Sequence, residues 1–321
     1  MKRLLNSSLF SKDIEAVEKR LTEMALEAPS MVAGPLRILV SAPGKRVRPS
    51  LVILCGHLGQ YDRERHILAG AAVEAIHLAT LIHDDIIDGA ETRRGVPTLN
   101  TSLGPDIAVF AGDYVLMRAL KWLAPVLEPR DFQYVGDILS DLCTGEILQH
   151  ELRYDVDTAE SRYLEIVAQK TSSLFSLSCW LGARLARLGP GEIDSLIRYG
   201  KALGIAFQIA DDVMDLASTQ ESAGKPVLHD IRQGTYSLPV IYALRRDNTG
   251  ELLNLLRQGG HDEGAIRIAV SRIVTLGGID YAREVARKFS EEAIDAVKGL
   301  PGGLVKDLLE GLAMSAYSRE A

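Results

Sequence analysis

Apolar residues recur at three- and four-residue spacing along almost the whole chain, and this periodicity constrains the fold more than any other feature. Representative segments are DIEAVEKRLTEMALEA, ILAGAAVEAIHLATLIHDD and IDSLIRYGKALGIAFQIADDVMD. No stretch shows the sustained β-branched alternation of a half-buried strand. Gly and Pro pairs such as Pro43-Gly44 and Pro301-Gly302 interrupt the pattern, which predicts many helices joined by short loops. The expected fold is one all-α domain spanning residues 1–321.

Composition narrows the possible functions. The net charge of −7 and the lack of a basic run argue against a nucleic-acid-binding surface. Three scattered cysteines are too few for a disulfide framework or a zinc site, and they fit a reduced cytosolic compartment. The N-terminal residues turn polar too early for a signal peptide, and no apolar run is expected to span a membrane. We therefore expect a soluble cytoplasmic protein.

Two acidic clusters repeat within the chain. ATLIHDDIIDGA aligns without gaps on AFQIADDVMDLA, and six of the twelve positions are identical. Positions i and i+4 share a face of a helix, so Asp84 and Asp88 point the same way, as do Asp211 and Asp215. Like charges at that spacing destabilise an isolated helix. One such cluster is usually a solvated helix end, but two matching clusters favour a site for a hard cation.

The expected cation is magnesium. Mg²⁺ usually takes one or two protein carboxylates and completes its octahedron with water and substrate phosphates. The clusters therefore predict a magnesium–diphosphate site rather than a structural metal.

Short basic clusters near Gly, Pro or the acidic motif could bind the diphosphate. A single Lys or Arg is usually a surface residue, but diphosphate needs several donors and arginine can bind it with two parallel hydrogen bonds. The candidates are Lys45, Arg46, Arg48, Arg93, Arg94, Lys170, Thr171 and Lys225. His77 lies two turns before Asp84 on about the same helix face, so it is either a core residue or part of the site.

Together these motifs resemble those of the all-trans polyprenyl diphosphate synthases, the head-to-tail isoprenyl chain elongases. The similar stretches are HDDIIDGAETRRG, AGDYVLMRAL, GEILQHE, QKTSSLFSLSCWLGA, FQIADDVMD and GKPVLHDIRQGTYSLPVIYAL. The chain is most similar to the medium- and long-chain branch, including the catalytic component of two-component heptaprenyl diphosphate synthases.

The resemblance implies a single large helical bundle of the isoprenoid synthase type around a deep central cavity. It implies that Mg²⁺ is bound by Asp84, Asp85, Asp88, Asp211 and Asp215. The residues it implies for the allylic diphosphate are Arg93, Lys170, Thr171, Gln208 and Lys225, and those for isopentenyl diphosphate are Lys45, Arg48, His77 and Arg94. The implied catalytic residues are Asp84, Asp88, Asp211 and Lys170.

The resemblance also implies the reaction and the partners. An allylic diphosphate, farnesyl or geranylgeranyl, is condensed with successive isopentenyl diphosphates to give a polyprenyl diphosphate for quinone side chains. Family members are normally dimeric. Many carry a lysine where this chain has Thr235, and some two-component members also lack that lysine. The expectation is either a homodimer or a heterodimer with a small regulatory subunit.

The helix before the first acidic cluster bears on product length. Short-chain family members typically have a bulky aromatic four or five residues before that motif, whereas residues 66–83 contain no aromatic side chain apart from the histidines. Small residues could simply allow tight helix packing. Alternatively they leave a tunnel open, with hexaprenyl to octaprenyl diphosphate as the product and heptaprenyl as the central expectation. The predicted tunnel residues are Val73, Ile76, Ala79 and Thr80, with Phe110 and Trp122 as candidates for its floor.

Rival functions stay open at the level of sequence. A short-chain geranylgeranyl diphosphate synthase would share every motif except the long tunnel. A class I terpene cyclase would normally replace the second aspartate cluster with an Asn/Ser/Glu-type metal motif. A metal-dependent phosphohydrolase would need more His and Asp ligands, and a non-catalytic regulatory subunit would have lost aspartates.

Overall fold

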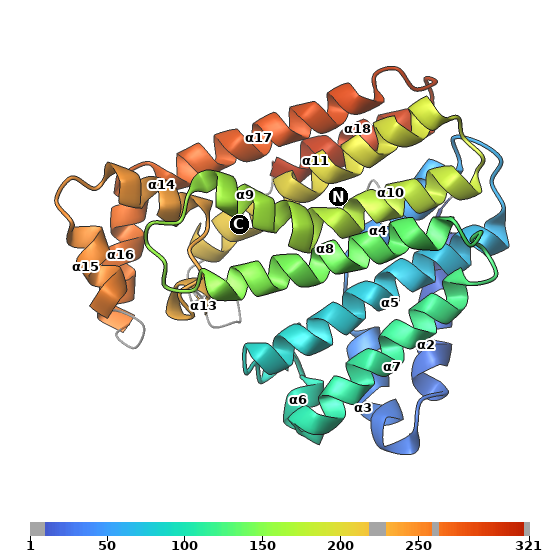
Figure 1. Ribbon diagram of the computed structural model, residues 1–321, viewed down its shortest axis with the longest axis horizontal. Coiled ribbons are helices and arrows are strands. Elements are labelled where there is room, and N and C mark those ends of the chain that lie inside the picture. The colour runs from blue at the N-terminus through green and yellow to red at the C-terminus, as the bar shows by residue number, and fades with distance from the viewer. Residues whose placement is uncertain (1–9, 218–228, 259–262, 318–321) are drawn as a thin grey trace. The chain divides into compact units, whose positions relative to one another are not determined.

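The computed structural model describes residues 10–217, 229–258 and 263–317 (Figure 1). Helices dominate these residues, which confirms the predicted all-α class. The contacts group the chain into two compact units, and neither unit is contiguous in the sequence. Unit 1 comprises residues 1–135, 177–197 and 300–309, and unit 2 comprises residues 136–176, 198–299 and 310–321. A single domain over residues 1–321 stays a prediction.

Unit 1 is built around one long helix. Its elements are α2 (Ser11–Leu26), α3 (Ser30–Ser41), α4 (Val47–Gly56), α5 (Arg63–Ile87), β1 (Thr92–Arg93), β2 (Val96–Pro97), α6 (Leu99–Leu103) and α7 (Pro105–Leu123). Helix α5 packs against α2, α4 and α7. Asp62 caps the N-terminus of α5 by accepting a hydrogen bond from the Arg65 N–H. Because neighbours cover so much of α5, its small and β-branched residues are buried almost all round.

Helix α5 requires one correction to the sequence expectation. By its length and composition alone α5 could cross a membrane, whereas no apolar segment of that length was expected from the sequence. However, 67% of its apolar window is buried inside the protein, and Glu74 and Asp85 on the same helix are also buried. Burial of this kind is typical of the core helix of a globular domain.

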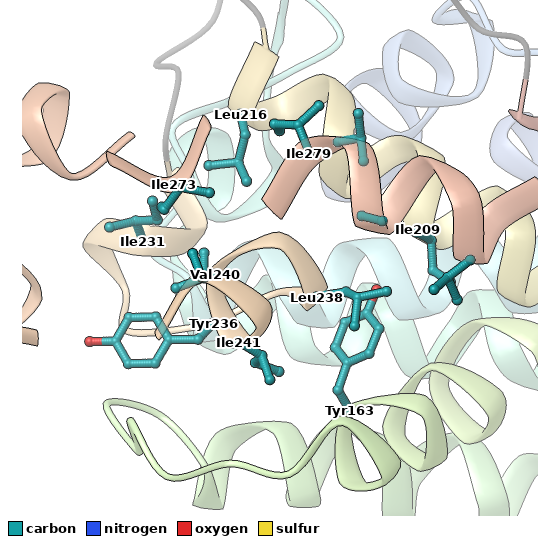
Figure 2. Close-up of a cluster of buried hydrophobic side chains, with 14 of the residues drawn as sticks. Tyr163, Ile209, Leu216, Ile231, Tyr236, Leu238, Val240, Ile241, Ile273 and Ile279 are labelled. Carbon is teal, nitrogen blue, oxygen red and sulfur yellow. The ribbon is translucent and has the colours of Figure 1, made fainter. Parts of the chain in front are cut away.

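Unit 2 has a separate hydrophobic core. Its elements are α9 (Glu160–Val167), η1 (Ala168–Ser172), α13 (His229–Arg232), α14 (Leu238–Arg246), α15 (Glu251–Gln258), α16 (Glu263–Thr275) and α17 (Gly278–Val297). Figure 2 shows part of the core cluster, with Leu238 of α14 beside Tyr163 of α9 and Val240 of α14 on the side of Ile231 of α13. Each fully buried aliphatic side chain of this kind stabilises the fold by about 1.5–3 kcal/mol.

Within the part of the chain that the structure describes, four helices contribute residues to both units, namely α8 (Asp131–Glu151), α10 (Ser173–Leu185), α11 (Pro190–Ala217) and α18 (Leu304–Tyr317). Glycines permit close helix packing within each unit. In unit 1, a Cβ on Gly182 of α10 would lie 2.3 Å from the Val52 carbonyl oxygen of α4. In unit 2, a Cβ on Gly278 would lie 2.4 Å from the Pro239 carbonyl oxygen.

A short hairpin is the one departure from the all-helical expectation among the described residues. Strands β1 and β2 pair antiparallel, with Thr92 opposite Pro97 and Arg93 opposite Val96. Arg94 and Gly95 form the turn and have φ values of 53° and 80°. Two successive positive φ values are what a two-residue type I′ hairpin turn requires. The hairpin was not predicted because arginine is a rare residue in the first of these positions.

Candidate active site

The first acidic cluster lies at the C-terminal end of α5. Asp88 caps this helix, and its N–H donates to the Asp84 carbonyl oxygen at 2.8 Å. Asp84 and Asp88 therefore stay one helical turn apart on the same side, as predicted. A helix C-terminus carries a partial negative charge, which disfavours additional carboxylates unless a cation is nearby. The local electrostatics thus favour cation binding at this helix end.

Asp85 is rotated about 100° around α5 from Asp84, and it accepts a hydrogen bond from an arginine of the β1–β2 hairpin. Its side chain is almost fully buried, and Arg93 Nε donates to Asp85 Oδ1 at 2.6 Å. Burial raises the pKa of Asp85, and the adjacent guanidinium of Arg93 opposes that shift. The contact ties the β1–β2 hairpin to the end of α5. Asp85 Oδ2 is buried and has no hydrogen-bond partner among the described residues.

Unit 1 also gathers a cluster of cationic side chains around His77. Removal from water lowers the pKa of His77 well below 6.5, and Arg48, Arg94, Arg93 and Arg46 lower it further. The imidazole is therefore neutral at physiological pH. Within unit 1 the structure thus brings together three of the four residues predicted for isopentenyl diphosphate, Arg48, His77 and Arg94.

The fourth residue, Lys45, lies in the exposed loop before α4. A Cβ on its neighbour Gly44 would lie 3.0 Å from Arg94 Nη1, so this loop and the hairpin are adjacent. Arg46 in the same motif has a structural role. It donates to Glu74 Oε1 at 2.9 Å, to Glu18 Oε1 at 3.1 Å and to a backbone carbonyl.

Unit 2 carries the residues predicted for the allylic diphosphate. Lys170 and Thr171 lie on η1, a single π-helical turn of the kind that often marks a functional site. Two glycines allow neighbouring helices to approach this turn closely. A Cβ on Gly145 of α8 would lie 2.7 Å from the Lys170 backbone nitrogen, and one on Gly204 of α11 would lie 2.6 Å from the Ser172 Cα.

Sequence reasoning missed a carboxylate beside Lys170. Lys170 Nζ donates to Glu146 Oε2 at 2.7 Å, and both side chains are about one quarter exposed. The motif GEILQHE was part of the resemblance, but no role was given to Glu146, the first of its two glutamates. The structure shows that Gly145 and Glu146 together support Lys170.

The second acidic cluster divides between two faces of α11. Asp211 and Asp215 share one face, whereas Asp212 is rotated from Asp211 by about 100°. Asp212 is buried, and its carboxyl group accepts hydrogen bonds from Tyr163 at 2.6 Å and from Gln208 at 2.7 Å. Burial and the nearby Asp230 raise the pKa of Asp212 to about 8, although its two donors oppose the shift.

Gln208 joins the two motifs of unit 2. Its side-chain oxygen accepts a hydrogen bond from Thr171 at 2.8 Å, and its amide nitrogen donates to Asp212. Thr171 and Gln208, both predicted for the allylic diphosphate, are therefore in direct contact. Lys225, which was also predicted, lies outside the described residues.

The donor set of each cluster fits magnesium bound together with a phosphate-bearing ligand. Among the described residues no group of three His, Cys, Asp or Glu side chains could by itself hold a metal ion. Mg²⁺ commonly uses only one or two carboxylates, and Asp85, next to Asp84 in sequence, has a buried carboxylate oxygen without a hydrogen-bond partner. The residues thus suit an ion whose remaining ligands are water and diphosphate oxygens.

The predicted tunnel residues all lie on α5. Val73, Ile76 and Ala79 are buried and Thr80 is half-buried, with its hydroxyl donating to the His77 carbonyl oxygen at 2.8 Å. Phe110 does not fit its predicted place. Its side chain is 68% exposed on α7, so it cannot be an interior floor of this chain alone.

A sequence model of the polyprenyl synthetase family matches residues 29–273. The chain belongs to this family. Heptaprenyl diphosphate synthase component 2 of Geobacillus stearothermophilus is 34% identical to it over 314 residues, covering 98% of each protein. This family membership confirms the resemblance inferred from the motifs.

Solved structures from the family agree in fold. The polyprenyl synthase of Caulobacter crescentus, complexed with calcium and isoprenyl diphosphate, has a TM-score of 0.93 and 29% identity, covering 99% of this chain and 98% of that one. Geranylgeranyl pyrophosphate synthase of Lactobacillus brevis has a TM-score of 0.92 and 29% identity, covering 99% of this chain and all of that one. Proteins named for different products thus share the fold, so the fold alone does not indicate product length.

Proposed function

We propose that this protein is a trans-prenyltransferase that condenses an allylic diphosphate with successive isopentenyl diphosphates to a medium- or long-chain polyprenyl diphosphate. The observation that carries this proposal is its similarity, over nearly the full length of both chains, to a heptaprenyl diphosphate synthase component. All six aspartates of the two clusters are present, which disfavours a terpene cyclase and a non-catalytic subunit.

The residues divide between two substrates. Lys45, Arg48, His77 and Arg94 of unit 1 bind isopentenyl diphosphate, and the proximity of the last three supports this assignment. Arg93, Lys170, Thr171 and Gln208 bind the allylic diphosphate, with Lys225 as a further donor. Asp84, Asp88, Asp211 and Asp215 hold Mg²⁺. Asp85 orients Arg93, and its unpartnered second oxygen is the atom that would serve as a further ligand for Mg²⁺.

The bonding changes in the reaction are balanced without a protein nucleophile. The allylic carbon–oxygen bond breaks, and its electron pair leaves with diphosphate. The double bond of isopentenyl diphosphate supplies the electrons of the new carbon–carbon bond, and loss of a proton to the released diphosphate restores an alkene. Bound magnesium supplies electrostatic stabilisation to the departing diphosphate.

The side chains of the protein contribute charge and exclude water. Lys170 and Arg93 are cations held in place by Glu146 and Asp85, so little reorganisation is needed when negative charge builds on the diphosphate. His77 is uncharged and can donate one hydrogen bond to isopentenyl diphosphate. Val73, Ile76 and Ala79 are apolar and are the residues we assign to the path of the growing chain, where water would otherwise capture the allylic cation.

We place the product between hexaprenyl and octaprenyl diphosphate. The Geobacillus relative is named for heptaprenyl, and residues 66–83 lack the bulky aromatic that would block chain growth. The same relative is named as component 2, which supports a second component here as an alternative to a homodimer. A cytoplasmic location completes the proposal and fits the burial of α5.

Product analysis tests the proposed function. Purified protein is incubated with labelled isopentenyl diphosphate, farnesyl or geranylgeranyl diphosphate, and either Mg²⁺ or excess chelator, and the dephosphorylated products are then sized. The expected result is a ladder that ends between hexaprenyl and octaprenyl and requires Mg²⁺. Full activity in chelator would contradict the metal assignment, and termination at geranylgeranyl would place the protein among the short-chain synthases.

A further inference from the structure

The polar residues of α11 lie on two neighbouring faces that have different surroundings. Asp211 and Asp215 are half-buried on one face. Gln208 and Asp212, also four residues apart, lie on the next face and bond to residues of η1 and α9. Any rotation of α11 about its axis would move both faces together. Contacts on the second face therefore contribute, together with the apolar packing of α11, to where the aspartates of the first face point.

Tyr163 is the deepest of these contacts. Its ring belongs to the hydrophobic core of unit 2, and Figure 2 shows it extending from α9 to a position beside Leu238. Its hydroxyl donates to Asp212 Oδ2 at 2.6 Å. A phenylalanine would supply the same apolar ring, so the hydroxyl is not needed for packing. A hydroxyl buried in an apolar cluster is costly unless it is hydrogen-bonded, and here the bond is to Asp212.

A chain of hydrogen bonds connects this contact to the predicted diphosphate site. Tyr163 donates to one oxygen of Asp212, Gln208 donates to the other, and Thr171 donates to Gln208. The chain joins α9, η1 and α11 through four side chains. Thr171 adjoins Lys170 on the π-helical turn, whose backbone packs against Gly145 and Gly204. The position of Lys170 and the rotation of α11 are thus linked.

We propose that Tyr163 is a positioning residue for the reaction, because its hydroxyl holds Asp212 and thereby orients Asp211 and Asp215 toward the metal and the allylic diphosphate. The inference rests on the proposed function for its catalytic consequence. Neither Tyr163 nor Asp212 contacts the reacting atoms in this proposal. Their role is to fix the direction in which other carboxylates point.

The experiment compares Tyr163→Phe, Asp212→Asn and the double variant with wild type. Tyr236→Phe is the matched control, because Tyr236 belongs to the same core cluster and Figure 2 shows its hydroxyl pointing away from it. Binding of Mn²⁺ with inorganic diphosphate is measured by electron paramagnetic resonance, alongside kcat, both KM values and the melting temperature.

We expect Tyr163→Phe to weaken Mn²⁺–diphosphate binding and to lower kcat, each by about tenfold, which is the typical effect of one lost hydrogen bond to a carboxyl group. The KM for isopentenyl diphosphate should stay within about twofold of wild type, because its proposed residues lie in the other unit. The double variant should be no worse than the more impaired single variant, since both changes remove the same interaction. Tyr236→Phe should match wild type in metal binding and kcat.

Two outcomes would overturn the inference. One is unchanged Mn²⁺–diphosphate binding in Tyr163→Phe, even if its melting temperature falls, because that pattern indicates a purely structural hydroxyl. The other is a double variant whose losses of Mn²⁺–diphosphate affinity and kcat equal the combined losses of the two single variants. If wild type formed no prenyl product, the proposed function would fail, whereas Mn²⁺–diphosphate binding and its double-variant comparison would still decide whether Tyr163 orients the aspartates.

Discussion

At the scale of single residues, the placement of negative charge at the end of α5 is the feature that most favours a bound cation. Asp84 and Asp88 add negative charge to the C-terminal end of α5, where the helix dipole already disfavours it. Like charges on adjacent turns of a helix end lower stability, and the proposed metal and diphosphate binding would account for their presence.

Removal of one aspartate from either cluster should abolish most activity. Asp84→Ala or Asp211→Ala is expected to lower kcat by about 10²–10³-fold or more, because each removes charge stabilisation from the departing diphosphate. Steady-state kinetics would measure the loss, with circular dichroism to check that the helices persist. Glu64→Ala, at the exposed first turn of α5, is the control and should retain full activity. Near-normal turnover in either aspartate variant would contradict the two-cluster mechanism.

His77 should make the protein less stable in mild acid. Because burial removes it from water and the nearby Arg48, Arg94, Arg93 and Arg46 add to the effect, its pKa lies well below 6.5 in the folded state, and the unfolded state binds a proton more readily. The free energy of unfolding should therefore fall as pH drops below about 6.5, by at most about 1.4 kcal/mol per pH unit for one proton. Thermal melts of wild type and His77→Gln between pH 7.5 and pH 5 would measure this, and the variant should lose less stability.

A matched substitution distinguishes this effect from general acid sensitivity. Thr80 lies on α5 about one turn from His77 and carries no titratable group. Thr80→Val should keep the pH dependence of wild type. If His77→Gln also kept it, protonation of His77 would not account for the loss of stability in acid.

At the scale of elements, the helices and the acidic clusters were predictable, but the short connecting structures were not. Apolar periodicity identified α5 and α11, and the repeated aspartate pattern located both clusters because helical spacing alone sets which carboxylates share a face. The β1–β2 hairpin lacks the usual Asn-Gly or Asp-Gly turn signal, because Arg94 occupies the first position with positive φ.

The π-helical turn and its supports depend on residues distant in sequence. η1 follows α9 without any Gly or Pro, and it packs against Gly145 and Gly204 of other helices. Tyr163 also carried no signal, because a single tyrosine on a helix face reads as a core residue. Only the folded positions show that its hydroxyl reaches Asp212.

Helix α5 provides a test of product length. Val73 lies 11 residues before Asp84, which is about 16 Å along the helix at 1.5 Å per residue. Ala79→Tyr or Thr80→Phe should block a chain growing along this face and shift the products to farnesyl or geranylgeranyl size, as measured by product sizing. Ala79 is buried, so its variant risks overpacking, and half-buried Thr80 provides the second variant.

The control for this prediction is Thr80→Ser, which adds no bulk on the same face of the helix. Its product distribution should match that of wild type. Unchanged products in both Ala79→Tyr and Thr80→Phe would show that the growing chain does not follow this face of α5.

At the scale of the whole molecule, the surface of α7 bears on assembly. Phe110 is 68% exposed and Met117 is 55% exposed, and their seven-residue spacing puts them on one face of the helix with Asp113 between them. Large apolar side chains that share an exposed helix face are typical of protein–protein contacts. This placement explains why Phe110 failed as an interior floor, and it makes α7 the proposed contact with a second chain.

Two measurements on the purified chain would identify that second chain. If the protein is a homodimer, light scattering should give twice the chain mass of 35.0 kDa, and Phe110→Glu should shift it toward the monomer by placing a charge in an apolar contact. Met31→Glu, at a similarly exposed apolar position on α3, should leave the mass unchanged. If instead a separate small component is required, the wild-type chain should be monomeric and make little or short product alone. Robust synthesis of hexaprenyl or longer products by a dimeric wild type would exclude an obligatory partner, and it would show that Thr235 suffices where many relatives carry a lysine.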